Sequence, residues 1–435
     1  MKPVNVGIVG LGTVGSGTFN VLYRNAEDIA RRAGRDIVVT HVGARRDNPN
    51  ADTSGVTVSR DIFAVVNDPN VDILVELIGG TTVAFELVMK AIENGKHIVT
   101  ANKALIAEYG NEIFAAAQEK GVNVAFEAAV AGGIPIIKAI REGLSANRID
   151  WVAGIINGTG NFILTEMAEK GRDFDDVLKE AQALGYAEAD PTFDVEGIDA
   201  AHKLTILASI AFGIPLQFPK IYTEGITRIT REDVSYAEEL GYRIKHLGVT
   251  RQTDNGVELR VHPTLIPESR LIANVNGVMN AVMVQSDAVG PTLYYGPGAG
   301  SEPTASAVVA DVVDVARALT TDPNNRVPHL AFQADTLSDT PILPIEDVVT
   351  GFYLRMHVKD QPGVLAKIAA ALSDSDINIE AIIQKDQADE SSPVPLIMIV
   401  RQVVESKMNN ALDKIRALGV LADDVVRIRL ETLDC

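Results

Sequence analysis

Short apolar runs and amphipathic stretches alternate along the first third of the chain. The runs at 4–9, 37–42, 73–77, 97–100 and 122–126 are rich in β-branched residues and predict strands, whereas 61–66, 85–93 and 113–120 predict helices. Strands that alternate with helices are typical of βαβ units, whose strands are parallel. The pattern therefore predicts an α/β Rossmann-like domain with a doubly wound sheet.

A glycine-rich turn follows the first predicted strand and opens a helical stretch that continues to about residue 32. It contains Gly10, Gly12, Thr13, Val14 and Gly15. In this setting the first two glycines allow a tight turn and a close approach of pyrophosphate, and the third allows close helix packing. A plain glycine-rich turn is the alternative, but the placement favours dinucleotide binding by these five residues.

The end of the second predicted strand bears on which dinucleotide binds. A basic residue there suits the 2′-phosphate of NADP, whereas an acidic residue suits the ribose of NAD. Arg45 and Arg46 favour NADP, whereas Asp47 is compatible with NAD. We expect NADP or NAD, with a preference for NADP and with Arg45 as a contact. A solvated strand end is the alternative interpretation.

Composition narrows the class of protein further. A chain of 435 residues, 46% of them hydrophobic, is long enough for about three domains. The net charge of -19 and the lack of a basic patch argue against a nucleic-acid partner. The sequence has no apolar run of about 18 residues and no signal peptide, and its single cysteine, Cys435, cannot form an intrachain disulfide. We therefore expect a cytoplasmic protein without a membrane partner.

The segment 181–203 gathers ionisable residues just before an apolar helix. Asp190 and the proline after it predict a turn, and Asp194 is a candidate helix N-cap. Glu196, Asp199 and Lys203 would then share one helix face, with Lys203 at the mouth of a buried helix. An ordinary salt bridge between Asp199 and Lys203 is the alternative.

At these spacings the segment resembles the signature of homoserine dehydrogenases, through Ala181, Gly185, Tyr186, Ala187, Asp190, Pro191, Asp194, Gly197, Asp199 and Lys203. The resemblance implies that Lys203 donates the proton in aldehyde reduction and accepts it in alcohol oxidation, with Asp199 orienting it. It also implies that Lys103, in the motif 100–103, reaches the nicotinamide and the substrate. Glu188 would receive the ammonium of the amino acid, with Gly158, Thr159 and Asp194 as further substrate contacts.

The same resemblance extends to three other stretches. Ala101 and Lys103 would contact the cofactor, and the glycine-rich turn 295–300 would close over it through Gly300. The loop 127–135 would hold a monovalent cation, Na⁺ or K⁺. Its ligands would be the carboxylate of Glu127 and the backbone carbonyls of Val130, Gly132 and Ile134. Gly160 departs from the threonine or serine that is usual in the family, which puts a hydroxyl contact at that position in doubt.

The last part of the chain follows a Pro-rich linker at 340–346. Its predicted order is strand 351–358, helix 364–373, strand 377–384, strand 395–401, helix 406–418 and strand 425–430. This βαββαβ order predicts a ferredoxin-like fold. With Asp360 to Leu365 at the first turn and Asn378 leading the second strand, it resembles an ACT domain, which implies amino-acid-dependent regulation. An inert oligomerisation module is the alternative.

These observations predict three domains. The NAD(P)-binding Rossmann domain would span 1–135, with 305–340 returning to it. The α+β substrate-binding, catalytic and dimerisation domain would span 136–304, and the ACT regulatory domain 350–435. The glycine turn begins so early that we expect no aspartate kinase domain before it, as in monofunctional homoserine dehydrogenases.

The resemblance implies the NAD(P)-dependent interconversion of L-homoserine and L-aspartate 4-semialdehyde, in threonine, methionine and isoleucine biosynthesis. Threonine is the expected effector, and a homodimer or homotetramer the expected assembly. A phosphorylating aspartate-semialdehyde dehydrogenase would need a thiolate nucleophile, for which Cys435 is a poor candidate. A dehydrogenase for another small hydroxy or amino acid, and a sensor that binds without turnover, stay open as alternatives.

Overall fold

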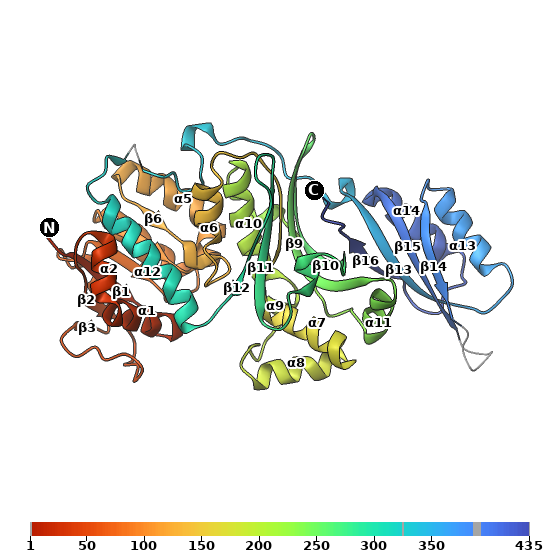
Figure 1. Cartoon of the computed structure of the whole chain (residues 1–435), viewed down its shortest axis with the longest axis horizontal. Helices are drawn as coiled ribbons and strands as arrows, with labels where there is room; N and C mark the ends of the chain where they lie inside the picture. Colours follow the sequence, from red (N-terminus) through yellow and green to blue (C-terminus); the bar gives the residue numbers. More distant parts are fainter. Residues whose placement is uncertain (1, 324–325, 386–392, 435) are drawn as a thin grey trace. The chain divides into compact units, whose positions relative to one another are not determined.

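The computed structural model describes residues 2–323, 326–385 and 393–434. The chain forms two compact units, whose helices and strands are labelled in Figure 1. The first unit consists of Met1–Gly158, Asp199–Ile221 and Val278–Thr340, and the second of Thr159–Ile198, Tyr222–Gly277 and Pro341–Cys435. Each unit is therefore built from three separate stretches of sequence. Within the described residues, no helix combines the length and the apolar character needed to cross a bilayer.

The first unit contains a six-stranded parallel sheet of order β3-β2-β1-β4-β5-β6. Its strands are β1 (Val4–Val9), β2 (Ile37–Gly43), β3 (Thr57–Ser59), β4 (Ile73–Glu76), β5 (His97–Thr100) and β6 (Val124–Ala125). The connecting helices are α1 (Thr13–Arg24), α2 (Ala26–Ala33), α3 (Phe63–Asn67), α4 (Thr82–Glu93) and α5 (Lys103–Lys120). The prediction of a doubly wound α/β domain is confirmed, although the sequence pattern missed β3 and the break between α1 and α2.

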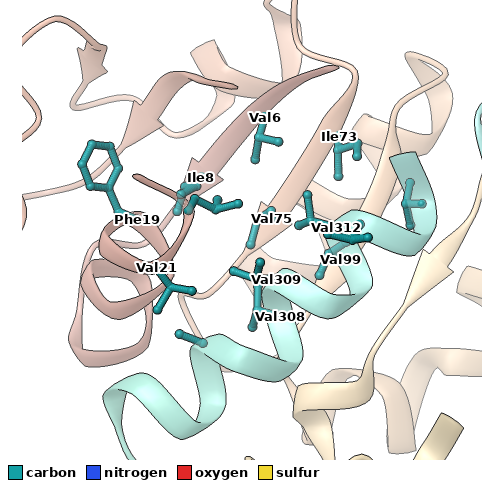
Figure 2. Close-up of a cluster of buried hydrophobic side chains, with 14 of the residues drawn as sticks. Val6, Ile8, Phe19, Val21, Ile73, Val75, Val99, Val308, Val309 and Val312 are labelled. Atoms are coloured by element: carbon teal, nitrogen blue, oxygen red, sulfur yellow. The ribbon is translucent and has the colours of Figure 1, made fainter. Parts of the chain in front are cut away.

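A helix from far along the chain completes the core of this sheet. The helix α12 (Ser301–Ala318) packs beside α1, and Figure 2 shows its Val308 and Val312 facing Val75 of the sheet. All three valines are fully buried. Burial of a side chain of this size stabilises a fold by about 1.5 to 3 kcal/mol. Residues near 310 are therefore part of the same core as β1 and β4.

The rest of the first unit consists of an antiparallel strand group, several short elements and the helix α10, which carries part of the polar cluster described below. The strands β7 (Ile149–Ile155), β11 (Met279–Ser286) and β12 (Gly290–Pro297) form an antiparallel group in which β11 pairs with both others. Shorter elements are η1 (Glu127–Ala129), α6 (Ile136–Lys138), η2 (Ala139–Gly143), η3 (Phe218–Lys220) and η6 (Ala334–Thr336). The apolar helix α10 (Ile198–Phe212) is buried over most of its length.

The second unit combines helices with a continuous run of strands ordered β9-β10-β16-β13-β15-β14. These strands are β9 (Tyr242–Thr253), β10 (Gly256–Pro267), β13 (Val349–Val358), β14 (Ile379–Gln384), β15 (Val394–Val404) and β16 (Val426–Leu430), and β8 (Tyr222–Thr223) also pairs with β10. The helical elements are α7 (Gly158–Lys170), α8 (Phe174–Ala183), α9 (Thr192–Val195), α11 (Arg231–Glu239), η4 (Leu271–Asn274), η7 (Ile345–Asp347), α13 (Val364–Ser373) and α14 (Glu405–Ala417). The βαββαβ module at the end of the chain is confirmed.

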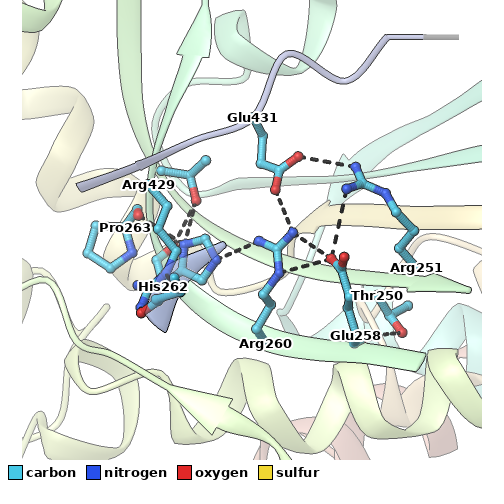
Figure 3. A network of polar contacts seen from close by, with 10 residues as sticks. Thr250, Arg251, Glu258, Arg260, His262, Pro263, Arg429 and Glu431 are labelled. Atoms are coloured by element: carbon cyan, nitrogen blue, oxygen red, sulfur yellow. Dashed lines mark hydrogen bonds and ion pairs between the residues drawn. The ribbon is translucent and has the colours of Figure 1, made fainter. Parts of the chain in front are cut away.

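Buried ion pairs link that terminal module to β10 (Figure 3). Arg260, fully buried on β10, donates to Glu258 and to Glu431, which follows β16. Arg429 on β16 donates to Glu405 and, over 2.6 Å, to Glu224. Because each guanidinium is matched by carboxylates, its burial is electrostatically balanced. The terminal module is thus part of the second unit.

One local prediction is wrong. The structure places Asp194 inside the short helix α9, not at an N-cap, and Glu196 lies between α9 and α10. Gly197 has a φ of +83°, a left-handed conformation that ends one helix before the next begins. Asp199 and Lys203 share a helix, but Glu196 does not belong to it.

Candidate active site

Two lysines and one aspartate form a polar cluster in the first unit. Lys103 is the first residue of α5, and Asp199 and Lys203 lie one turn apart on α10. The Nζ of Lys203 is 2.6 Å from one carboxylate oxygen of Asp199, and the Nζ of Lys103 is 3.1 Å from the other. The structure therefore brings together all three predicted catalytic residues, and a single carboxylate binds two ammonium groups.

The surroundings of Asp199 hold it as an anion. Its side chain is 8% exposed, and it accepts a further hydrogen bond of 2.8 Å from the Nδ2 of Asn157. Burial alone would raise the pKa of Asp199, but the charges of Lys203 and Lys103 and the hydrogen bonds outweigh burial and hold the pKa well below its usual value. Lys203 also donates to the carbonyl oxygen of Ile156 over 2.7 Å.

The predicted cofactor-binding turn has the backbone geometry that a dinucleotide requires. Gly10 has a φ of +97°, and a Cβ on Gly15 would lie 1.9 Å from the carbonyl oxygen of Gly10. A Cβ on Gly12 would meet none of the described atoms within 4 Å, so the backbone is open to a ligand there. Thr13 and Val14 begin α1, whose amide groups can bind phosphate.

This turn borders a cavity of about 820 Å³ in the first unit. Gly10 and Gly12, the strand end 43–49 and the loop 77–83 line the cavity. Its size and glycine-rich lining fit a nicotinamide dinucleotide, which would be held by the amides of the turn and by the strand end. Ala101, in the connection between β5 and α5, is half-buried.

The strand end carries more positive charge than the sequence pattern revealed. Arg45, Arg46 and Asp47 all line the cavity and are exposed. Arg60, which follows β3, lies 2.7 Å from Asp47 and also donates to the carbonyl oxygen of Ala44. Asp47 is therefore already bound by an arginine, and Arg60 is a residue that the sequence analysis missed because it missed β3.

Gly300 lies close to the same turn. It precedes α12 with a φ of +123°, a conformation that favours glycine. The hydroxyl of Ser301 donates to the carbonyl oxygen of Thr13 over 2.8 Å. A Cβ on Gly17 would lie 2.5 Å from the Ser301 hydroxyl. The start of α12 therefore packs tightly against the start of α1.

The predicted cation loop contains a buried carboxylate. Glu127 is 1% exposed, and its two oxygens accept the backbone N–H groups of Ile137 and Lys138 at 2.9 and 2.8 Å. Burial and then the negative charge of Asp311 raise the pKa of Glu127 to about 7. The two hydrogen bonds and the charge of Lys138 lower the pKa, but they do not outweigh burial and Asp311. A monovalent cation, with its preference for hard oxygen ligands, would fit here.

The backbone of that loop has left-handed φ values at Ala131 and Gly132, which lie between two other predicted ligands, Val130 and Ile134. Val130 and Ile134 are buried, and Gly132 has a φ of +46°. A Cβ on Gly132 would lie 2.5 Å from the carbonyl oxygen of Gly298, so only glycine fits. Among the described residues, no group of three or more histidine, cysteine, aspartate or glutamate side chains could hold a metal ion.

The remaining predicted substrate residues lie around α7 and the segment after α8. Gly158 begins α7, and a Cβ there would lie 2.7 Å from the carbonyl oxygen of Val278. In the second unit, the hydroxyl of Thr159 donates to the carbonyl oxygen of Tyr186 over 2.6 Å. Glu188 is exposed and Asp194 half-buried. Thr159 thus holds the segment that carries Glu188.

Comparison with known proteins identifies the family. The homoserine dehydrogenase profile matches residues 135–313, the profile of the homoserine dehydrogenase NAD-binding domain matches 10–127, and the ACT domain profile matches 352–420. A homoserine dehydrogenase of Pseudomonas aeruginosa is 70% identical over 434 residues, covering 100% of both chains. The chain belongs to the homoserine dehydrogenase family.

Other members agree with this result. A homoserine dehydrogenase of Neisseria gonorrhoeae is 57% identical, with 100% of both chains covered. The crystal structure of a homoserine dehydrogenase from Thiobacillus denitrificans, 66% identical, has a TM-score of 0.95 and covers 100% of this chain and 99% of its own. A hyperthermophilic archaeal homoserine dehydrogenase in complex with NADPH is 26% identical, with a TM-score of 0.61 over 72% of this chain and 98% of its own.

The comparisons confirm the resemblance, the fold class and the oxidoreductase class. The NAD-binding profile and the archaeal NADPH complex support a nicotinamide cofactor for this member of the family. The roles of individual residues and the three domain boundaries stay predictions. The structure adds Asn157, which the sequence analysis did not select, to the polar cluster, because its contact with Asp199 joins residues 42 positions apart.

Proposed function

We propose that this homoserine dehydrogenase interconverts L-homoserine and L-aspartate 4-semialdehyde, with NADP or NAD, at the cluster of Lys103, Asp199 and Lys203. The observation that carries the proposal is the carboxylate of Asp199 between two ammonium groups, at 2.6 and 3.1 Å. Reduction of an aldehyde needs a proton at its oxygen, and a lysine can supply it while stabilising the developing negative charge. When bound, the nicotinamide supplies or accepts the hydride.

Lys203 is the proton donor in reduction and the base in oxidation. Its ammonium is held by Asp199 and by the carbonyl oxygen of Ile156, and its side chain is only 12% exposed. Lys103, with a side chain that is 33% exposed, aids the placement of substrate and cofactor. A group held by two fixed partners is pre-organised, and this reduces the cost of orienting it for proton transfer.

The substrate is recognised as an amino acid. Glu188 would bind its ammonium, since an exposed carboxylate pairs readily with a charged amine. Thr159 supports this role because its hydroxyl donates to the carbonyl oxygen of Tyr186, which lies two residues before Glu188 in the sequence. Gly158 and Asp194 are the other proposed substrate contacts. Replacement of Glu188 by glutamine should raise the KM for homoserine more than the KM for NADP⁺, and equal changes in both would contradict the assignment.

The preferred cofactor is NADP. Arg45 and Arg46 line the cavity beside the glycine turn, and Asp47, the residue that would favour NAD, is bound by Arg60. Three arginines against one aspartate leave an excess of positive charge, which suits a 2′-phosphate. Gly10, Gly12, Thr13, Val14, Gly15, Ala101 and Gly300 complete the proposed cofactor contacts.

Glu127 is the proposed ligand of a monovalent cation, Na⁺ or K⁺, with the carbonyl oxygens of Val130, Gly132 and Ile134. The support is the buried carboxylate whose pKa is raised to about 7. The cation would balance this charge at neutral pH.

We also propose that the ACT domain binds threonine, that the enzyme acts in threonine, methionine and isoleucine biosynthesis, and that it forms a homodimer or homotetramer.

The reaction is tested with purified protein, L-homoserine and NADP⁺ or NAD⁺, by following the absorbance of the reduced cofactor. Lys203→Met should lose turnover and retain NADPH binding, and Lys220→Met, an exposed lysine on η3, should behave as wild type. Wild-type protein that binds NADPH but oxidises no homoserine would overturn the proposal. A sensor, or a dehydrogenase for another small hydroxy or amino acid, would then be favoured.

A further inference from the structure

A buried glutamate lies at the end of β4, in the first unit. Glu76 is fully buried, and one of its carboxylate oxygens accepts the backbone N–H groups of Ile78 and Gly79 at 2.9 and 3.3 Å. The other oxygen accepts the hydroxyl of Thr100 over 2.6 Å. Burial raises the pKa of Glu76, and these hydrogen bonds offset the rise only in part. Each of the three groups donates a hydrogen, so both carboxylate oxygens act as acceptors.

These contacts close into a ring. Thr100, the last residue of β5, also accepts the backbone N–H of Asn102 over 2.9 Å. The side chain of Asn102 donates to the carbonyl oxygen of Gly80 over 2.6 Å and accepts the N–H of Leu105, which caps α5. The ring therefore runs from Glu76 through the loop 78–80 to Asn102, and through Thr100 back to Glu76.

Two functional parts of the first unit meet this ring. Lys103, which lies 3.1 Å from Asp199, directly follows Asn102 and begins the helix that Asn102 caps. The loop 78–80 lines the cavity beside the glycine turn, and both Gly79 and Gly80 have left-handed φ values, of +71° and +72°. Two such glycines in succession form a flexible segment unless other groups hold it. The ring supplies those groups.

We propose that Glu76, Thr100 and Asn102 are positioning residues, which set Lys103 and the loop 78–80 in their working geometry. This inference rests on the proposed function. A buried hydrogen-bond network in which every member has a partner fixes one arrangement of the backbone. A misplacement of about 1 Å in a catalytic group can lower the rate by about 100-fold. Loss of one ring member should therefore reduce turnover without removing a group that touches the substrate.

The ring is tested with matched threonine variants. Thr100→Val removes the hydroxyl and keeps the shape of the side chain, whereas Thr100→Ser keeps the hydroxyl. Thr40→Val is the control, because Thr40 lies on β2 of the same sheet and its buried hydroxyl has no hydrogen-bond partner among the described residues. We expect kcat for homoserine oxidation to fall by about 10- to 100-fold in Thr100→Val and to stay within about twofold of wild type in the other two.

Amide hydrogen exchange gives a readout that does not depend on activity. The backbone N–H groups of Ile78, Gly79 and Asn102 are bound by the ring, so their exchange should accelerate in Thr100→Val and not in Thr40→Val. Glu76→Gln serves as the second variant. Its amide group would donate to the Thr100 oxygen, which already accepts from Asn102, so the Thr100 hydroxyl would lose its acceptor.

The proposal would be overturned if these three amides exchanged at wild-type rates in both Thr100→Val and Glu76→Gln. It would also be overturned if the kcat of Thr100→Ser were as low as that of Thr100→Val. A merely structural role would lower the thermal stability of Thr100→Val and leave the kcat of the folded protein unchanged. Should Thr100→Val fail to fold, Glu76→Gln decides by the same two measurements. Wild-type protein without homoserine oxidation would refute the proposed function, and the exchange data would still test the ring.

Discussion

Replacement of Asp199 by asparagine removes the charge between Lys103 and Lys203 and keeps the shape of the side chain. The amide oxygen can still accept from Lys203, which lies 2.6 Å from one carboxylate oxygen. The amide nitrogen would take the place of the other oxygen and face the Lys103 ammonium, 3.1 Å away, so two donors would meet. Two ammonium groups would then share a site that contains no counter-charge from residue 199.

The expected loss follows from these contacts. A hydrogen bond to a charged group contributes about 1.5 to 3 kcal/mol, and breaking a buried ion pair costs about 3 to 5 kcal/mol. In Asp199→Asn the amide oxygen can still accept from Asn157 and from Lys203. We therefore expect this substitution to lower the free energy of unfolding by about 2 to 4 kcal/mol. Lys203 would also lose its orienting charge, and kcat should fall by about 100- to 10,000-fold.

Urea unfolding of the full chain and initial rates with homoserine and NADP⁺ measure the two effects. The control is Asp176→Asn, which breaks an exposed pair with Lys179 at 3.8 Å on a helix surface. An exposed pair of this kind contributes about 0.5 kcal/mol or less. The ordinary salt-bridge interpretation of Asp199 predicts the same small change. If Asp199→Asn matched the control in stability and kept its kcat within about tenfold of wild type, the reasoning would be refuted.

Three further predictions concern the cofactor, the pH dependence and the terminal module. Arg45→Ala should raise the KM for NADP⁺ by about tenfold and barely change that for NAD⁺, because only NADP⁺ carries a 2′-phosphate; equal changes would contradict the assignment. The pKa of Glu127 is raised to about 7 in the folded protein, above the value of about 4.3 in the unfolded chain. Protonation of Glu127 therefore contributes its full stabilisation below about pH 4, and this stabilisation is lost as the pH rises through 7. In choline chloride the Tm should therefore fall as the pH rises from about 5 to about 8, and NaCl should offset this fall. Glu127→Gln should reduce both the pH effect and the sodium effect. A sodium effect of the same size in Glu127→Gln would argue against the cation site. Arg429→Met should lower the free energy of unfolding in urea by about 3 kcal/mol, because Glu224 loses its arginine and Glu405 keeps only Arg427, at 3.2 Å. The exposed Arg416→Met should change it little.

Features with a local pattern could be predicted from the sequence. The turn from Gly10 to Gly15 is set by glycines at fixed spacing, and α13 has the bounds that its apolar periodicity indicates. Asp199 and Lys203 are four residues apart, which places them on one helix face in any helix. Predictions of this kind need no knowledge of which segments meet in the fold.

Contacts between distant segments could not be predicted in this way. Glu76 and Thr100 are 24 residues apart, and nothing in either strand marks the pair, because each strand reads as an ordinary buried run. Arg60 was missed since β3 has only three residues, which is too short for a periodic pattern. The break after α9 was missed because Gly197 allows the chain to turn, and glycine alone does not show whether it will.

The terminal module shows why a self-contained pattern does not imply a separate body. Its βαββαβ order is complete in sequence, and a Pro-rich linker precedes it. Yet β16 pairs with β10 at Thr264 and Arg429, and the linker itself pairs through Ile342 with Val257. Arg260, fully buried on β10, donates to Glu431 from beyond β16 as well as to Glu258 of its own strand. Because Glu431 joins Glu258 on this buried guanidinium, and loss of a partner from a buried ion pair is destabilising, β10 and the terminal module stabilise each other.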